Sequence, residues 1–214
     1  MENQKTILAK IVIATAILSL LCLLLLHFLS PEFGPSWRMV SEYALGKHQW
    51  ALSLFFIFWG ISSITLGVLL WNIVTTKAAK IGVILLFVSG IGSSSASIFD
   101  VEHSLHGLSG FLGIPTIIAA SLLVSYHLKH KENWKPFIKP IVLNAHLTWV
   151  SLLLMVVTMV LMITGFQNAG IEFKEGSELS GVRIIPHCGV SIIPHFFQSG
   201  AFANLRGRGQ KRKS

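Results

Sequence analysis

Residues 97–110 read SIFDVEHSLHGLSG and separate two long hydrophobic runs with two acids, two histidines and no lysine or arginine. The acids are Asp100 and Glu102, and the histidines are His103 and His106. Charged side chains are costly inside a bilayer, so a segment of this kind marks a point where the chain leaves the hydrocarbon. This hinge indicates where one membrane span ends and the next begins, and it places chemically useful side chains at a membrane boundary.

The rest of the chain has the composition of an integral membrane protein. Of its 214 residues, 52% are hydrophobic and only 12% are charged, which excludes an ordinary soluble domain. A helix needs roughly 18 or more apolar residues to cross about 30 Å of hydrocarbon. Five uncharged runs meet this requirement: residues 11–29, 50–74, 81–99, 107–126 and 141–166. Because the bilayer core offers no water to unpaired backbone groups, we expect an all-α, polytopic membrane helix bundle.

The chain divides into a bundle and a tail. We expect a single membrane helix-bundle domain over residues 1–166, because no loop in this part is long enough to form a soluble domain. The tail, residues 167–214, has two interpretations. Residues 182–205 are moderately apolar and would form a sixth crossing, although Pro186 and Pro194 interrupt them. Alternatively the tail is poorly ordered, and its closing RGRGQKRKS has the basic composition of such a segment.

The distribution of basic residues predicts the orientation of the bundle. Cytoplasmic loops of membrane proteins collect lysine and arginine. With the N-terminus inside, the inner side holds eight lysines: Lys5, Lys10, Lys77, Lys80, Lys129, Lys131, Lys135 and Lys139. The outer side then holds only Arg38 and Lys47 before the tail. We therefore expect a multi-pass protein of the cytoplasmic membrane with its N-terminus inside. The net charge of +8 is scattered over several loops, so the expected partner is the lipid bilayer and not nucleic acid.

This orientation brings two polar loops to the outer side of the membrane. The first loop supplies Glu32, Ser41, Glu42, Tyr43 and His48, and His27 precedes it at the end of the first run. The second loop is the hinge. Histidine and carboxylate are the ordinary protein ligands of divalent metals, and both residue types also serve as acids and bases. The simpler alternative is that these side chains hydrogen-bond to loop backbone or face water.

A specific site can be assigned to these loops. Asp100, His103 and His106 recur every three residues, so a helical hinge would place both histidines on one face. We predict these three residues as ligands of a divalent metal such as zinc. Glu42 would then act as proton carrier, and Ser41 or Tyr43 would orient the substrate.

Two further features lie inside the spans. His146 lies near the cytoplasmic end of the fifth run. A haem would need histidines on facing helices at matched depth, and the sequence indicates no such partner for His146. The third run ends in SSSAS, residues 93–97. These serines either bond to helix carbonyls and form packing surfaces or line a polar cavity that leads inward from Asp100.

The sequence also resembles a known family. The SEYALG at residues 41–46, the small-residue-rich third helix ending in Phe99 and Asp100, and the histidine that opens the fourth helix are similar to the bacterial and archaeal membrane family called domain of unknown function 998. The resemblance covers about residues 10–166. It implies a compact multi-pass bundle, usually of six helices, with no assigned biochemical activity.

The resemblance also implies which residues form the family's motifs. The outer-loop motif falls on Ser41, Glu42, Tyr43 and Gly46, and the acid and histidine fall on Asp100 and either His103 or His106. The chain departs from the family pattern after the fifth span, where IIPHCGVSIIPHFF stands in place of the family's last helix. An altered or frameshifted C-terminus would explain this departure.

Three functional hypotheses follow. The first is an integral membrane protein without catalysis, acting as a binding, sensing or structural component of the cytoplasmic membrane, with a lipid or small molecule as ligand at the outer face. The second is a membrane-embedded, metal-dependent hydrolase that acts on a lipid-like substrate. The third is a small transporter, with a path between the serine-rich third helix and a fourth helix kinked at Pro115. The lack of a strong catalytic motif favours the first hypothesis.

Overall fold

The computed structural model describes residues 2–33 and 39–168, and these residues form helices and turns without any strand. The elements in chain order are α1 (Glu2–Leu29), η1 (Val40–Leu45), α2 (Gln49–Trp71), α3 (Lys77–Ser95), α4 (His106–Leu128), η2 (Glu132–Phe137) and α5 (Ile138–Asn168), where η marks a 3₁₀ helix. Each of the five α-helices is long and apolar enough to cross a membrane. The prediction of an all-α, polytopic bundle with five spans is confirmed.

The predicted tail is only partly covered by these residues. Its first two residues, 167 and 168, belong to the end of α5. The remainder, which includes the alternative sixth crossing at residues 182–205, lies outside the described residues.

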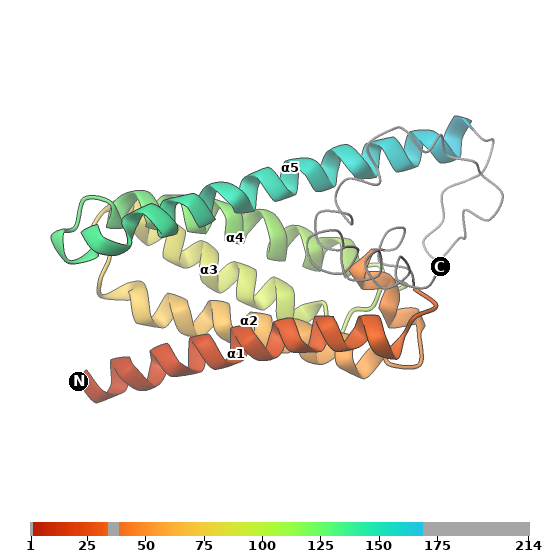
Figure 1. The fold of residues 1–214 in the computed structure, drawn as a ribbon, viewed down its shortest axis with the longest axis horizontal. Coiled ribbons are helices and arrows are strands. Elements are labelled where there is room, and N and C mark those ends of the chain that lie inside the picture. Colours follow the sequence, from red (N-terminus) through yellow and green to blue (C-terminus); the bar gives the residue numbers. More distant parts are fainter. Residues whose placement is uncertain (1, 34–38, 169–214) are drawn as a thin grey trace, which may run out of the picture.

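The helices lie side by side in chain order, with α1 along one side of the molecule and α5 along the other (Figure 1). Each packs mainly on its neighbours in sequence, so α3 takes the middle position between α2 and α4. The chain runs up and down, which gathers the loops at two ends. The basic end holds the N-terminal turns of α1 and the α2–α3 and α4–α5 loops, and the hinge end holds η1 and residues 96–105.

The third helix begins and ends four residues earlier than the uncharged run 81–99. It begins at Lys77 because Thr76 caps it, with the Thr76 hydroxyl oxygen accepting a hydrogen bond from the Ala79 amide at 3.3 Å. Near its other end, the Ser95 hydroxyl bonds to the Gly92 carbonyl at 2.8 Å and the Ser97 hydroxyl to the Ser94 carbonyl at 2.6 Å. Such local bonds compete with helix continuation.

Residues 96–105 form turns and not a helix. The prediction that His103 and His106 would share one helical face depended on a helical hinge, and the structure does not meet that condition. His106 is instead the first residue of α4.

Glycines bring the backbone of α3 against both of its neighbours. A Cβ atom added at Gly60 of α2 would lie 2.0 Å from the Ser94 hydroxyl oxygen and 2.7 Å from the Gly90 carbonyl oxygen. On the other side of α3, a Cβ atom at Gly92 would lie 2.6 Å from the Gly113 amide nitrogen of α4. Small residues allow this close approach, on which helix association in membranes depends. The three central helices are therefore held at backbone contact distance.

Serine hydroxyls add hydrogen bonds across these interfaces. Ser89 is fully buried in α3 and donates to the Gly113 carbonyl of α4 at 2.7 Å. The single proton of the Ser95 hydroxyl is shared between the Gly92 carbonyl and the Ser109 hydroxyl oxygen of α4, which lies 3.0 Å away. No buried side-chain nitrogen or oxygen in the described part of the chain lacks a hydrogen-bond partner. These contacts support the interpretation of the serines as packing residues.

We predict that Gly92→Ala destabilises the bundle, because the added methyl group meets α4 backbone that cannot rotate away. Overpacking of this kind costs about 1–3 kcal/mol, and the midpoint of thermal unfolding in detergent, followed by circular dichroism, should fall accordingly. Gly110→Ala is the matched control, since nothing lies within 4 Å of its added Cβ. That variant should be neutral or more stable by up to about 1 kcal/mol. Equal destabilisation by both changes would contradict the packing described for α3 and α4.

Candidate functional site

The predicted Ser41, Glu42 and Tyr43 lie in η1 at the hinge end, and two of the three are buried. Glu42 is 4% exposed and Tyr43 is 1% exposed, whereas Ser41 is half-buried. The Glu42 carboxylate oxygen Oε2 accepts a hydrogen bond from the Met39 amide at 3.1 Å. This bond satisfies a backbone donor that a short helix leaves unpaired at its start. Glu42 therefore stabilises the first turn of η1.

Tyr43 ties η1 to the end of α1. Its hydroxyl donates to the Phe33 carbonyl at 2.9 Å, and His27 Nδ1 lies 2.7 Å from the same hydroxyl oxygen. A phenol has one proton, and Tyr43 donates it to the Phe33 carbonyl. The bond between His27 and Tyr43 therefore requires a protonated Nδ1 on His27, which donates to the Tyr43 hydroxyl oxygen. The imidazole and phenol rings also meet edge to face, with centroids 5.6 Å apart.

Gly46 makes room for this arrangement. A Cβ atom at Gly46 would lie 2.7 Å from Cε2 of Phe33, whose ring centroid is 5.3 Å from that of Tyr43. We refer to His27, Phe33, Glu42, Tyr43 and Gly46 as the hinge-end clamp. The clamp packs on a hydrophobic cluster of α1 and α2 side chains that includes Leu26, Leu52 and Phe55.

Burial raises the pKa of the Tyr43 phenol above its ordinary value, and the negative charge of Glu32 raises it further. The phenol therefore keeps its proton at neutral pH. That proton is needed for the hydrogen bond to the Phe33 carbonyl.

The three predicted metal ligands hydrogen-bond to backbone inside the hinge. Asp100 Oδ1 accepts from the Glu102 amide at 3.2 Å, and His103 Nδ1 accepts from the Leu105 amide at 3.1 Å. His106 Nδ1 lies 2.8 Å from the Phe99 carbonyl oxygen, so this nitrogen carries the proton. When His103 is neutral, its proton sits on Nε2, and neither ring nitrogen keeps a free lone pair. The side chains thus hold the turns of the hinge together.

The structure places the clamp and the hinge at the same end of the bundle (Figure 1). The hydrogen bonds of the Asp100, His103 and His106 side chains stay within the hinge, and a bond from Ser53 of α2 to the Ser97 carbonyl at 3.4 Å connects the hinge to the bundle. Within residues 2–33 and 39–168, no three His, Cys, Asp or Glu side chains are grouped so that they could hold a metal ion. The zinc site stays a prediction.

Two histidine contacts at the basic end were not anticipated from the sequence. His127 Nε2 accepts from the Thr75 amide at 3.3 Å, so its protonated Nδ1 donates to Thr76 Oγ1 at 3.1 Å. This bond joins α4 to the α2–α3 loop. The bonded residues are 51 and 52 positions apart in the chain, and no sequence pattern predicts a contact over such a separation.

His146 hydrogen-bonds to a tyrosine of the neighbouring helix α4 and to a tryptophan of its own helix. Trp149 Nε1 donates to His146 Nδ1 at 2.9 Å, so Nε2 carries the proton and donates to the Tyr126 hydroxyl at 3.1 Å. His146 therefore bridges α5 to α4. The three-residue spacing of His146 and Trp149 on a helix could have predicted the bond between these two residues, but not the bond to Tyr126.

The family described as "Protein of unknown function (DUF998)" matches residues 13–174, which is most of the chain. The chain belongs to this family. No curated protein and no solved structure matches the chain. In this member of the DUF998 family, the SEYALG residues Glu42, Tyr43 and Gly46 build the hinge-end clamp.

We predict that Tyr43→Phe lowers the stability of the protein, because it removes the buried hydroxyl that joins the Phe33 carbonyl and His27. The expected cost is about 1–3 kcal/mol, measured as unfolding in detergent. The chain contains one other tyrosine, Tyr126, which is 45% exposed. Tyr126→Phe removes one interhelical hydrogen bond, to His146, at an exposed position, and it should cost only about 0.6 kcal/mol. A larger loss for Tyr126→Phe than for Tyr43→Phe would show that the clamp is not a stabilising element.

Proposed function

We propose that the protein is a non-catalytic component of the cytoplasmic membrane, with its N-terminus in the cytoplasm and a polar site for a lipid or small-molecule ligand at its hinge end. The observation that carries this proposal is the burial of Glu42 and Tyr43 in the clamp, where they hold η1 against α1 and α2. A catalytic acid or base must lie within hydrogen-bond reach of its substrate. Side chains that are 4% and 1% exposed and engaged with backbone suit a structural role better.

The hinge presents accessible polar side chains at this end. Glu102, His103 and Ser104 are exposed, whereas Val101 is buried and anchors the segment. The His103 ring packs on Phe99 with centroids 4.6 Å apart, which holds it in place. A surface that is exposed and internally bonded needs little reordering to bind a ligand, which favours a binding role.

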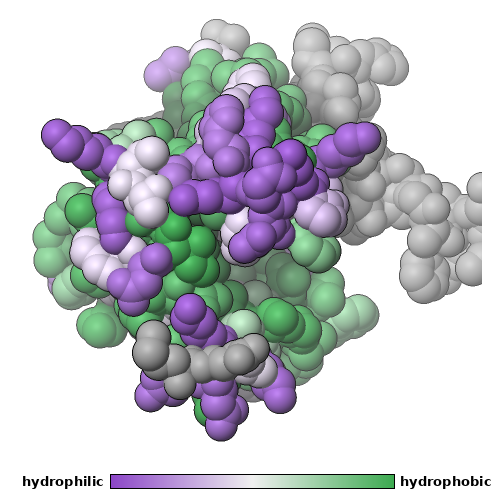
Figure 2. Space-filling model, turned by 90° about the vertical axis from the view of Figure 1, so that its left-hand side faces the viewer, coloured by the Kyte–Doolittle hydropathy of each residue, from purple (hydrophilic) through white to green (hydrophobic). Residues whose placement is uncertain are grey.

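The charges at the two ends support the proposed orientation. Eight lysines lie toward the basic end, against the acids Glu2 and Glu132. Figure 2 looks at this end and shows hydrophilic side chains spread across it. The described residues of the hinge end hold one lysine, Lys47, and four acids: Glu32, Glu42, Asp100 and Glu102. Such an excess of lysine is typical of a cytoplasmic face.

The two alternatives receive less support. A small transporter needs a polar path along its helices, whereas Ser89 and Ser95 donate hydrogen bonds to α4 and fill the α3–α4 interface. A metal-dependent hydrolase usually needs three protein ligands. Of the three predicted here, Asp100 and His106 keep an open lone pair, whereas His103 Nδ1 accepts a hydrogen bond from the Leu105 amide.

The orientation predicts the accessibility of introduced cysteines. The chain has two native cysteines, Cys22 and Cys188, which are first replaced by alanine. Ser104→Cys should then react with a membrane-impermeant maleimide in intact cells, and Lys135→Cys should react only after the membrane is opened. Both positions are exposed, so each serves as the reactivity control for the other. Labelling of Lys135→Cys alone in intact cells would show that the protein is inserted the other way round.

The non-catalytic role predicts that detergent-purified protein carries less than one equivalent of bound metal, and that Asp100→Asn does not change this content. Phospholipid and lipid-amide substrates should remain intact in its presence. Stoichiometric zinc that is lost in Asp100→Asn, together with a hydrolysis that His103→Ala abolishes and His130→Ala at the opposite end does not, would overturn the proposal in favour of the hydrolase.

A further inference from the structure

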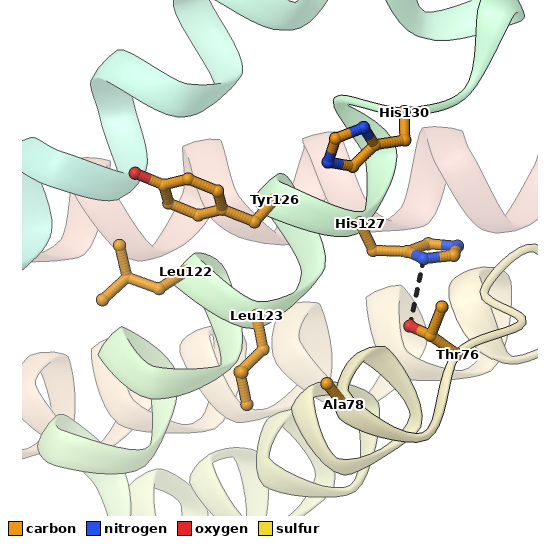
Figure 3. A pocket seen from close by; sticks show the side chains of 7 residues that line it. All are labelled: Thr76, Ala78, Leu122, Leu123, Tyr126, His127 and His130. Atoms are coloured by element: carbon orange, nitrogen blue, oxygen red, sulfur yellow. Dashed lines mark hydrogen bonds between the residues drawn. The ribbon is translucent and has the colours of Figure 1, made fainter.

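A cavity of about 400 Å³ opens at the basic end, between the start of α3 and the last turns of α4. Figure 3 shows the side chains that line it, which come from the α2–α3 loop and α3 on one side and from α4 and the turn after it, at His130, on the other. Because the helices end here, the cavity lies where a bilayer passes from hydrocarbon to headgroups. It takes no part in the hinge-end site.

One part of the cavity is apolar. Ala78 of α3 and Leu122 and Leu123 of α4 line it (Figure 3). Leu122 and Leu123 lie about one turn nearer to the middle of α4, and hence to the bilayer interior, than Tyr126 and His127. This part suits a hydrocarbon chain.

The part of the cavity nearest the loops presents hydrogen-bond donors. The Thr76 hydroxyl oxygen accepts from the Ala79 amide at 3.3 Å and from His127 Nδ1 at 3.1 Å, so both of its lone pairs are occupied. Its own proton is therefore directed at neither group and can donate to a ligand in the cavity. His130 is exposed at the rim and adds an imidazole.

Positive charge surrounds these donors. The Lys129 ammonium lies 5.8 Å from the ring centroid of Tyr126, which lines the cavity. The Lys131 ammonium donates to the Thr75 hydroxyl at 3.4 Å, beside Thr76. Glu132 is the nearest acid along this loop, and its carboxylate pairs with Lys135 at 2.7 Å. The amino-terminal end of α3 adds the positive end of a helix dipole.

We infer that this cavity binds one anionic phospholipid of the surrounding membrane. The phosphate group would lie by Thr76 and His130 between Lys129 and Lys131, and an acyl chain would follow Leu122 and Leu123. Basic pockets between transmembrane helices bind anionic headgroups by the same combination of charge and shape. A free phosphate ion would match only the donors, and the apolar part of the cavity selects a lipid. The inference does not depend on the hinge-end site or on the orientation of the protein.

The test is lipid retention by the purified full-length chain, measured by native mass spectrometry after exposure to equal amounts of phosphatidylglycerol and phosphatidylcholine. The wild-type chain should retain phosphatidylglycerol preferentially. Lys129→Gln and Lys131→Gln should each lower its retention about fivefold. Lys135→Gln is the matched control, because its ammonium pairs with Glu132 and not with a residue that lines the cavity, and it should retain phosphatidylglycerol like the wild type.

A second variant keeps the test independent of charge. Ala78→Leu fills the apolar part of the cavity from an exposed position in the first turn of α3, so it should abolish retention while circular dichroism shows an unchanged helix content. The inference is overturned if the wild type retains both lipids equally, if Ala78→Leu retains phosphatidylglycerol normally, or if the Lys135 control loses as much as the other lysine variants. Displacement of the lipid by an equal concentration of inorganic phosphate would identify a free-anion site and would also overturn it.

Discussion

The contact of α3 with the backbones of α2 and α4 is the constraint on which the rest of the structure depends. In a bilayer no hydrophobic force drives one apolar helix onto another, so association relies on close packing and on hydrogen bonds between helices. Gly60 and Gly90 allow the first contact, and Gly92 and Gly113 allow the second. The Ser89 hydroxyl adds a bond from α3 to the Gly113 carbonyl at the same level as the glycine contact. The outer helices α1 and α5 pack on α2 and α4, at the two sides of these three helices.

The up-and-down path of the chain gives the two ends of the bundle different chemistry. At the hinge end, polar side chains are used to fold the loops: Glu42 and Tyr43 hold η1, and His103 and His106 hold the turns before α4. At the basic end, His127 fastens one loop to the helix beside it. Lys129 and Lys131 of that end lie beside the cavity between α3 and α4, against Tyr126 and Thr75. The loops of the hinge end are therefore held in place by their own hydrogen bonds, and the basic end has a charged face that suits the headgroups of lipids.

Hydropathy and charge predicted the spans well and their boundaries less well. A run of uncharged residues locates the hydrocarbon core, but Lys77 and Lys80 belong to the first turn of α3 because a helix continues into the headgroup region. The hinge illustrates a second limit. A spacing of three residues at Asp100, His103 and His106 was compatible with a helical face, and local bonds from serine hydroxyls ended α3 before it could form.

The sequence by itself determined the fold class, the five spans and the sorting of charged residues between two ends, because the cost of placing charge in hydrocarbon and the length of a crossing depend on local composition. It also indicated the family through SEYALG and the hinge. Only the tertiary structure decided which polar groups meet, as with Tyr43 and His27, Thr76 and His127, and Tyr126 and His146. The physical reason is that these contacts depend on the rotation and depth of each helix against its neighbour. The packing of small residues sets this rotation and depth, and hydropathy predicts neither of them.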